Sequence, residues 1–131
     1  MRQKLIKKID RIFSAYIRRK LGDKKGYCTC IACGKKHIWK SGQIQAGHFV
    51  SRRFLVTRYD ERNVYPQCAY CNNWLAGNQY TYGKRIDELH GKGVADELML
   101  LSKQTIKIQN YELEEKYLFY KKNLITLKKQ L

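Results

Sequence analysis

The segment that decides the fold lies between two cysteine pairs, Cys30-Ile-Ala-Cys33 and Cys68-Ala-Tyr-Cys71. Four thiolates at this spacing can surround one tetrahedral zinc ion. Because the ion draws both ends of the intervening segment to one point, its binding energy becomes folding energy in a small domain. We therefore predict a closed structural zinc site formed by Cys30, Cys33, Cys68 and Cys71. A redox-active dithiol is the alternative, although one Cys-x-x-Cys motif would suffice for that.

A fifth cysteine, Cys28, precedes the first pair. It could replace Cys30 as a zinc ligand, but a Cys-x-x-Cys motif followed by glycine is the commoner arrangement, so we expect Cys28 to be a spectator. His37 follows two lysines and is expected at the surface, with a spare zinc ligand as the alternative. His90 precedes Gly91 at the end of an expected helix, and we interpret it as a capping residue.

The charge of the chain is strongly one-sided. Its 131 residues include 27 Lys and Arg against 11 Asp and Glu, a formal net charge of +16. Such an excess attracts a polyanion, with a strong salt dependence. We predict DNA as the partner and no membrane, because the basic segment 24–59 also holds cysteines and turns rather than one long amphipathic face. That segment contains no acid, and its basic residues are Lys24, Lys25, Lys35, Lys36, Lys40, Arg52, Arg53 and Arg58.

Composition also bears on compartment and size. No apolar run approaches the roughly 20 residues of a membrane-spanning helix, and the first residues show an amphipathic pattern without a signal-peptide core. We expect a cytoplasmic location in a reducing compartment, where cysteines serve as metal ligands more often than as disulfides. A hydrophobic fraction of 44% over 131 residues fits one domain with one modest core.

Hydrophobic periodicity predicts an α+β fold with three parts in one domain, 1–131. Residues 1–22 form a basic N-terminal helix, whose apolar residues recur at steps of three and four and which ends near Gly22. Residues 27–82 form the zinc-bound core. Residues 84–131 form a C-terminal helical region.

Within these parts the pattern predicts individual elements. Residues 37–57 are expected to form a strand pair that turns at Ser41-Gly42, because β-prone residues flank that turn signal. A loop is expected over residues 60–66. A short helix is expected to open near Asn72, and the Gly91-Lys92-Gly93 stretch is expected to break the C-terminal helical region once.

The last helix carries a heptad-like seam. Its apolar residues alternate at steps of four and three, which is the spacing of a coiled coil. Packing of this helix on its own domain is the favoured interpretation, and a dimer contact is the alternative. The seam consists of Leu113, Tyr117, Tyr120, Leu124, Leu127 and Leu131.

Three polar residues between and just after the cysteine pairs form a second pattern. His48 lies on the expected strand pair, Asn63 in the loop, and Asn72 directly after the last cysteine. Singly, the asparagines would be interpreted as a turn residue and a helix cap. In this order, a neutral His48 could take a proton from a water attacking a phosphodiester. The amide oxygen of Asn72 could hold a hard cation such as Mg²⁺.

This order of strand-His, loop-Asn and helix-Asn resembles that of HNH, or ββα-metal, nucleases. More specifically, the chain resembles the Rap/NinG family of phage recombination proteins from about Cys30 to Gly91. The stretches that carry this resemblance are Gln45-Ala46-Gly47-His48-Phe49, Arg58-Tyr59-Asp60-Glu61-Arg62-Asn63-Val64, Gln67-Cys68, Cys71-Asn72 and Gly77-Asn78.

The resemblance implies a zinc-stapled ββα-metal (HNH, treble-clef-like) core in a structure-specific endonuclease that cuts branched recombination intermediates such as Holliday junctions. It implies His48 as general base, Asn63 as the residue that orients this base or its strand, and Asn72 as ligand of a catalytic Mg²⁺ or Mn²⁺ ion. Zinc would be purely structural. Because a four-way junction is two-fold symmetric, a homodimer is expected.

One position departs from the nuclease pattern. Many such enzymes carry an acid directly before the base histidine as a second metal ligand, and here that residue is Gly47. Asp60 or Glu61 could act as a substitute, with ordinary ion pairing of a loop acid as the favoured alternative. We expect DNA contacts, or stabilisation of the cleaved phosphate, from Arg52, Arg53 and Arg58.

Two other functions remain open from the sequence. A non-catalytic zinc module that only binds DNA would need the cysteines and the charge, but not His48, Asn63 and Asn72 together. An HNH nuclease acting on linear duplex sites would need all of them.

Overall fold

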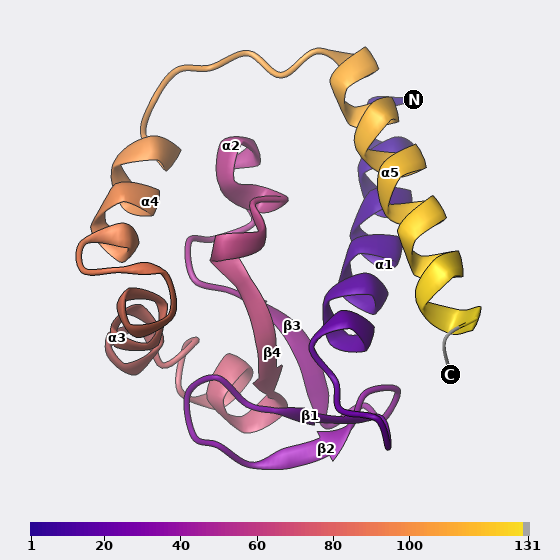
Figure 1. Cartoon of the computed structure of the whole chain (residues 1–131). Helices are drawn as coiled ribbons and strands as arrows, with labels where there is room; N and C mark the ends of the chain where they lie inside the picture. The colour runs from indigo at the N-terminus through magenta and orange to yellow at the C-terminus, as the bar shows by residue number, and fades with distance from the viewer. Residues whose placement is uncertain (130–131) are drawn as a thin grey trace.

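Two long helices from opposite ends of the sequence lie side by side in the computed structural model, which describes residues 1–129 (Figure 1). They are α1 (Arg2–Lys20) and α5 (Asn110–Lys129), and between them the chain forms a mixed α+β fold. The intervening elements are β1 (Tyr27–Thr29), β2 (Lys36–Ile38), β3 (Ile44–His48), α2 (Leu55–Arg58), the 3-10 helix η1 (Glu61–Asn63), β4 (Val64–Cys68), the π-helix η2 (Tyr70–Trp74), α3 (Gln79–His90) and α4 (Val94–Ser102).

Helix α1 forms where the apolar periodicity predicted it, and it ends one residue before Leu21, which is its C-cap in place of the expected Gly22. Its apolar stripe is buried against α5, β3 and β4. The buried residues of this first cluster are Ile6, Ile9, Phe13, Tyr16, Ile17, Tyr59, Val64, Leu113 and Tyr120.

The seam of α5 is used inside the chain. Leu113, Tyr120 and Leu124 are buried, and Tyr117 and Leu127 pack against the α1 cluster. Packing of this helix on its own domain is therefore confirmed, and the seam is not a free dimer contact. Leu131, the last member of the seam, lies outside the described residues.

The strands pair differently from the prediction. β1 pairs antiparallel with β2, and β3 pairs antiparallel with β4, from Ile44 opposite Cys68 to His48 opposite Val64. The expected strand pair within 37–57 is wrong, because Ser41-Gly42 joins two strands of different sheets. The loop expected over 60–66 is also corrected, since it contains η1 and the start of β4.

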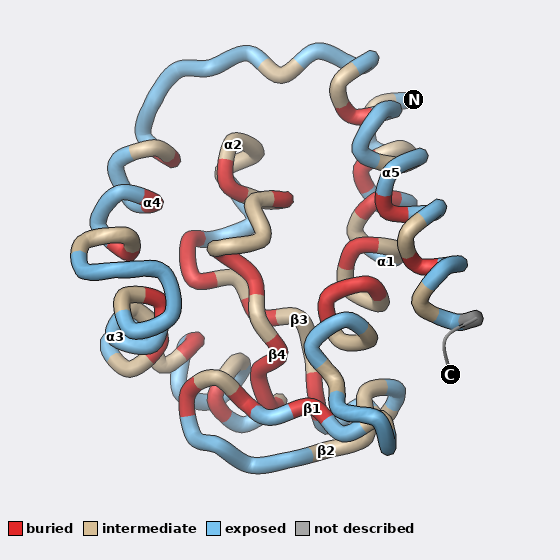
Figure 2. Tube along the Cα trace, viewed as in Figure 1, coloured by how far each residue is buried: buried red, intermediate tan, exposed pale blue. Residues whose placement is uncertain are grey.

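The C-terminal half closes the other side of the β3–β4 sheet. Helices α3 and α4 pack on the segment after β3 through another buried cluster, which includes Phe49, Tyr82 and Leu98. The region after Gly83 is broken twice, at Gly91–Gly93 and again over 103–109, and α3 begins earlier than expected, at Gln79. Figure 2 shows the second break as a mostly exposed connection between α4 and α5. Among residues 1–129, no helix is long and apolar enough to cross a membrane.

Candidate functional site

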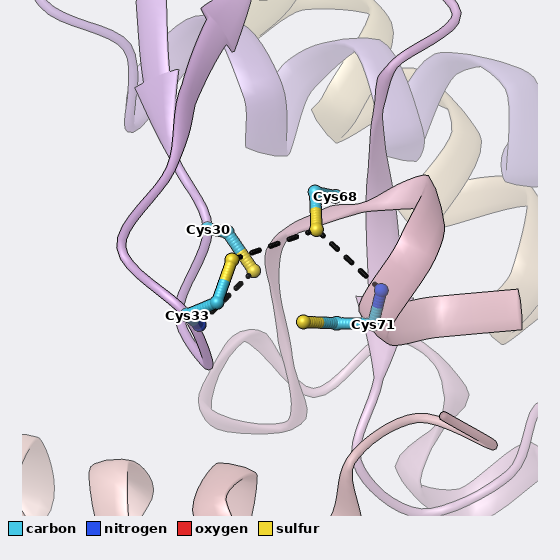
Figure 3. A group of neighbouring side chains, drawn as sticks. All are labelled: Cys30, Cys33, Cys68 and Cys71. Atoms are coloured by element: carbon cyan, nitrogen blue, oxygen red, sulfur yellow. Dashed lines mark hydrogen bonds between the residues drawn. The ribbon is translucent and has the colours of Figure 1, made fainter. Parts of the chain in front are cut away.

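The four cysteines of the two pairs meet at one point (Figure 3). Their sulfur atoms all lie within 4.8 Å of one another, and the Sγ atoms of Cys33 and Cys68 are 3.6 Å apart. Four sulfurs around a tetrahedral zinc at a Zn–S distance of about 2.3 Å would be separated by about 3.8 Å. The donor set and its spacing therefore fit a metal such as zinc.

Backbone donors and burial act in opposite directions on the thiolates of this cluster. Backbone N–H groups of Cys33 and Cys71 each donate to the first sulfur of their own pair, at 3.5 Å. Burial raises the pKa of the Cys71 thiol to about 12, and a divalent cation would offset that effect by stabilising the thiolate. Cys28 lies outside the cluster, as expected, and its Sγ donates to the carbonyl of Arg18 at 2.9 Å.

The cluster ties together two parts of the fold. Cys30 and Cys33 come from the turn between β1 and β2, Cys68 ends β4, and Cys71 lies in η2. Next to the sulfurs, the Ile31 N–H donates to the β4 carbonyl of Pro66 at 2.9 Å. A metal here would therefore fix the short helix that also carries the residue after Cys71.

That next residue, Asn72, lines a polar cleft of about 460 Å³. The cleft brings Asn72 from η2 together with His48 from β3 and with Arg52 from the following loop. It also includes three residues of α1. The lining residues are Asp10, Phe13, Ser14, Gln45, Ala46, His48, Ser51, Arg52, Asn72 and Asn73.

The ring of His48 has a defined orientation. Its Nε2 lies 2.9 Å from the carbonyl oxygen of Arg58. Because a carbonyl only accepts, Nε2 carries the hydrogen, and the lone pair of the neutral ring is on Nδ1. Burial lowers the pKa of His48 to about 4, and the positive charges of Arg52 and Arg58 act in the same direction. The ring is therefore uncharged at neutral pH and can accept a proton.

The amide of Asn72 is oriented by a neighbour on β3. Its Nδ2 donates to the Oε1 of Gln45 at 2.7 Å. This contact uses the nitrogen, so the Oδ1 is the atom left to act as a ligand. Asn72 lies inside a π-helix and is not the helix cap that asparagine at this place would suggest.

Asn63 is fully buried and holds the loop that follows His48. Its Oδ1 accepts from the Val50 N–H at 2.7 Å. Its Nδ2 donates to the carbonyls of Val50 at 3.0 Å and Thr57 at 3.1 Å. Its own carbonyl accepts from the Phe49 N–H at 2.9 Å. The side chain thus fixes the backbone at Val50, two residues beyond His48, and the Asn63 main-chain carbonyl fixes Phe49; Asn63 does not line the cleft itself.

The glycine before His48 has no room for a side chain. A Cβ at Gly47 would lie 2.1 Å from the Oε1 of Gln67 and 2.8 Å from its Cβ. Gln67 cannot easily withdraw, because it is fully buried and its Nε2 donates to the Gly77 carbonyl at 2.6 Å. On its other side, the Gly47 carbonyl accepts from the buried hydroxyl of Tyr82 at 2.5 Å.

An acid that the sequence reasoning missed lies in the cleft. Asp10 receives hydrogen bonds from Arg58, at 3.0 Å from Nε and 2.5 Å from Nη2, and from the Tyr59 hydroxyl at 2.7 Å. Burial alone would raise the pKa of Asp10, but the hydrogen bonds from Arg58 and Tyr59 outweigh it and lower that pKa. The one available signal was a single acid in an otherwise basic amphipathic helix, which does not reveal its distant partners.

The three arginines occupy different places. Arg52 lines the cleft and Arg53 is exposed, with its guanidinium 5.1 Å from the ring of Phe54. Arg58 instead pairs with Asp10 and donates to the Arg52 carbonyl at 2.8 Å. Its guanidinium is thus engaged within the protein.

The two acids considered as substitutes for the missing ligand lie elsewhere. Asp60 pairs with Arg62 at 2.8 Å, and Glu61 pairs with Lys20 at 2.9 Å. Neither lines the cleft. Both acids therefore form ordinary ion pairs, the favoured alternative to a role as metal ligand.

The remaining histidines do not join the cleft or the cysteine cluster. His37 is partly exposed on β2, opposite Cys28. His90 is the last residue of α3 and Gly91 is its C-cap, so the capping interpretation is wrong; the His90 Nε2 instead lies 2.5 Å from the Tyr65 hydroxyl.

Comparison with known proteins places these features in one family. The family described as "Bacteriophage Lambda NinG protein" matches residues 1–130. The protein ninG of Salmonella phage P22 is 33% identical over 94 residues. Those of Escherichia phage 933W and Escherichia phage lambda are 32% and 31% identical over 94 residues.

Each of these alignments covers 71% of this chain and 43% of the relative, so the match takes in less than half the length of these curated relatives. No solved structure matches the chain. The family match extends over nearly the whole sequence, including α1, the cysteine cluster and the cleft. The chain therefore belongs to the NinG family of phage proteins.

Proposed function

We propose that this chain is a metal-dependent endodeoxyribonuclease of the HNH type that hydrolyses phosphodiesters in branched DNA such as Holliday junctions. The observation that carries the proposal is the polar cleft that holds His48, Asn72 and Arg52 beside the cysteine cluster. In this view β3, β4 and η2 form the ββα-metal core. Zinc on the four cysteines is structural, and the protein acts in the cytoplasm of the bacterial host.

His48 acts as the general base. With Nε2 bonded to the Arg58 carbonyl, Nδ1 accepts the proton of the attacking water. A ring that is neutral at pH 7 is ready for this step, and its orientation need not change during the reaction. Asn63 contributes by fixing the loop after His48.

Asn72 would hold a Mg²⁺ or Mn²⁺ ion through Oδ1, in the orientation set by Gln45. Such an ion supplies charge stabilisation for the pentacovalent phosphate and the leaving 3′ oxygen. With no side chain at Gly47, the protein offers few direct ligands there. We therefore expect weak metal affinity without DNA, because phosphate oxygens and water would complete the coordination.

Positive charge would hold the DNA. Arg52 in the cleft and the exposed Arg53 are free to contact phosphates. Arg58 would contribute through its carbonyl and through its ion pair with Asp10 rather than by contacting DNA. The net charge of +16 supports a polyanionic substrate.

Branched DNA and a homodimer are proposed from the family resemblance and from the symmetry of a junction. Because the alignments cover 43% of the matched relatives, both concern the whole protein as much as this chain. Because α5 uses its seam against α1, a dimer would need another surface.

The test is cleavage of a four-way junction and of a linear duplex, each with and without Mg²⁺. We expect metal-dependent cleavage of the junction, a loss of at least about a hundredfold in His48→Ala, and junction binding that persists in a gel shift. His37→Ala is the matched control, since His37 lies outside the cleft.

Three outcomes would contradict the proposal. Unchanged cleavage by His48→Ala would remove the general base. No cleavage of either DNA with several metals would favour the zinc-containing DNA-binding module. Cleavage of the linear duplex at one sequence, with the junction untouched, would favour a duplex-specific nuclease.

A further inference from the structure

Exposed aromatic side chains recur from the last cysteine pair to the start of α3. Trp74 is 81% exposed, Tyr80 is 79% exposed and Tyr70 is 58% exposed. Large aromatic rings are normally at least half-buried in folded proteins, and exposed groups of them mark binding surfaces. Tyr70 and Trp74 are four residues apart in η2, about one turn of this π-helix, so their rings emerge from neighbouring positions on it.

The backbone that presents Trp74 is held firmly. Within the segment, the Gly77 N–H donates to the Cys71 carbonyl at 3.0 Å, and the Leu75 N–H donates to the Tyr70 carbonyl at 3.1 Å. The Gly77 carbonyl accepts from the buried Gln67. With Cys71 fixed in the cysteine cluster, Trp74 stands out from an ordered support rather than from a loose loop.

The position of Trp74 relates it to the cleft. Asn72 and Asn73 line the cleft, and Trp74 is the next residue in the same short helix. The cleft itself holds Arg52, and the ring of the exposed Tyr80 has the Lys84 Nζ 5.2 Å from its centroid. An exposed aromatic ring one residue from the lining of a polar cleft that holds an arginine, in a chain of net charge +16, suits a ligand that combines a π-face with a negative charge, as a nucleotide does.

We infer that Trp74, assisted by Tyr70, stacks on an unpaired nucleobase next to the phosphodiester held in the cleft. In a continuous duplex each base face is covered by its neighbours, whereas a branch point, a gap or a single strand offers uncovered faces. Stacking would thus select branched or single-stranded DNA without reading its sequence. The position of a phosphodiester in the cleft rests on the proposed function, whereas base stacking by Trp74 is a binding property that is measured without cleavage.

The chain allows a direct optical test. Its two tryptophans are Trp39 and Trp74, and Trp39 is partly buried, with the guanidinium of Arg19 4.9 Å from its ring. Trp39→Phe leaves Trp74 as the one indole. Its fluorescence is titrated, without divalent metal, with a single-stranded oligonucleotide, a four-way junction and a blunt duplex. We expect strong quenching by the first two and weak quenching by the duplex.

Affinity measurements complete the test. Trp74→Ala should weaken junction binding about tenfold and change duplex binding less than twofold, while Trp74→Phe should keep most of the junction affinity. Tyr111→Ala is the matched control, because Tyr111 is 62% exposed on α5, in another part of the fold. Zinc content and circular dichroism verify that each variant is folded.

Several results would overturn the inference. One is equal quenching of Trp74 by all three DNAs, and another is no quenching although gel shifts show binding. A concentration-dependent shift of Trp74 emission without DNA would mean that a second copy covers the ring. Unchanged junction affinity in Trp74→Ala, with His48-dependent cleavage intact, would reject the stacking and leave the proposed function standing. If Trp74→Ala lost the preference for the junction over the duplex while cleavage proved independent of His48, the stacking would stand and the proposed function would be rejected.

Discussion

The Nε2 of His48 lies 2.9 Å from the carbonyl of Arg58, and the Arg58 side chain is itself held in a two-point ion pair by Asp10. The proposed base is therefore oriented by a residue that helix α1 fixes in place. This connects the N-terminal helix to the proposed chemistry of the cleft. Basic charge was the one role that the sequence suggested for that helix, and the ion pair adds a second, positional role.

The environment of His48 predicts how the proposed cleavage should depend on pH. Burial lowers the pKa of His48 to about 4, so the base is already neutral at pH 6. We expect the single-turnover rate on a junction to fall as the pH drops through about 4, and to show no step from His48 near its ordinary pKa of about 6.5. A nuclear magnetic resonance titration of the His48 ring, assigned with His48→Ala, measures the same pKa independently. A His48 pKa near 6.5 would contradict the buried, neutral base.

The same group contributes to stability with a defined sign. Its folded pKa lies below the unfolded value, so the unfolded chain binds the extra proton as the pH falls. The contribution of His48 to the free energy of unfolding is complete above about pH 6.5 and is lost as the pH falls to about 4. Urea denaturation of the wild type and of His48→Ala at several pH values measures the difference. A difference that grows toward acid pH would have the wrong sign.

Asp10→Asn removes the charge that holds Arg58. The pair is largely shielded from solvent, with side-chain exposures of 21% for Asp10 and 18% for Arg58. We expect the free energy of unfolding to fall by about 2 kcal/mol. We also expect the rate of cleavage by the folded variant to fall, because the Arg58 carbonyl that orients His48 would no longer be fixed. Asp96→Asn, at an exposed position of α4, is the control. Cleavage at the wild-type rate by a folded Asp10→Asn chain would refute the positional role.

Removal of the metal tests the cysteine cluster. We expect one zinc per chain by mass spectrometry, lost in Cys71→Ala and retained in Cys28→Ala, since the Cys28 sulfur lies outside the cluster. A chelator should lower the melting temperature and also abolish cleavage in excess Mg²⁺, because Asn72 adjoins Cys71 in η2. Zinc retention by Cys71→Ala together with its loss from Cys28→Ala would mean that the ligands are wrongly assigned.

Restoring the acid before His48 should fail for steric reasons. A Cβ at position 47 meets Gln67 at 2.1 Å, so we expect Gly47→Asp to lower the free energy of unfolding by about 1–3 kcal/mol. In the double variant with Gln67→Ala, part of that loss should be recovered, giving a favourable coupling in a double-mutant cycle. Additive effects of the two changes, measured by urea denaturation, would show that the contact does not set the identity of residue 47.

Alanine substitutions on the two faces of α5 should lower the free energy of unfolding by different amounts. Leu113 is fully buried against α1, whereas Leu118 is 63% exposed. We expect Leu113→Ala to lower the free energy of unfolding by about 2–5 kcal/mol and Leu118→Ala by less than about 0.5 kcal/mol. Chemical denaturation compares them. Equal small effects would mean that the seam is not part of the core.

Sequence patterns predicted the features that depend on neighbouring residues, namely a helix and the cysteine cluster. The spacing of apolar residues predicted α1, and the two Cys-x-x-Cys motifs predicted that their four cysteines lie together, as they do in the structure. Pairing of distant segments was less accessible. Ser41-Gly42 looks like a hairpin turn, but β3 pairs with β4 because that register buries Ile44 and Val64, and no local signal reports it.

The candidate site shows the same division. His48 and Asn72 were identified from their order and meet in the cleft, whereas Asp10 was missed because its partners are 48 and 49 residues away. Asn72 lies in a π-helix, for which its residues give no distinctive pattern. Trp74 escaped notice because a single aromatic after a cysteine pair is ordinary until its exposure is known.

The close approach of Gly47 and Gln67 also limits how such a chain can evolve. A single codon change could replace Gly47 with an acidic residue, yet the new side chain would clash with Gln67, which already occupies that space. A lineage would have to shorten residue 67 first, and would then lose the hydrogen bond to Gly77 that steadies the turn after Trp74. Positions 47 and 67 should accordingly co-vary among relatives, with a large residue at 67 accompanying glycine at 47.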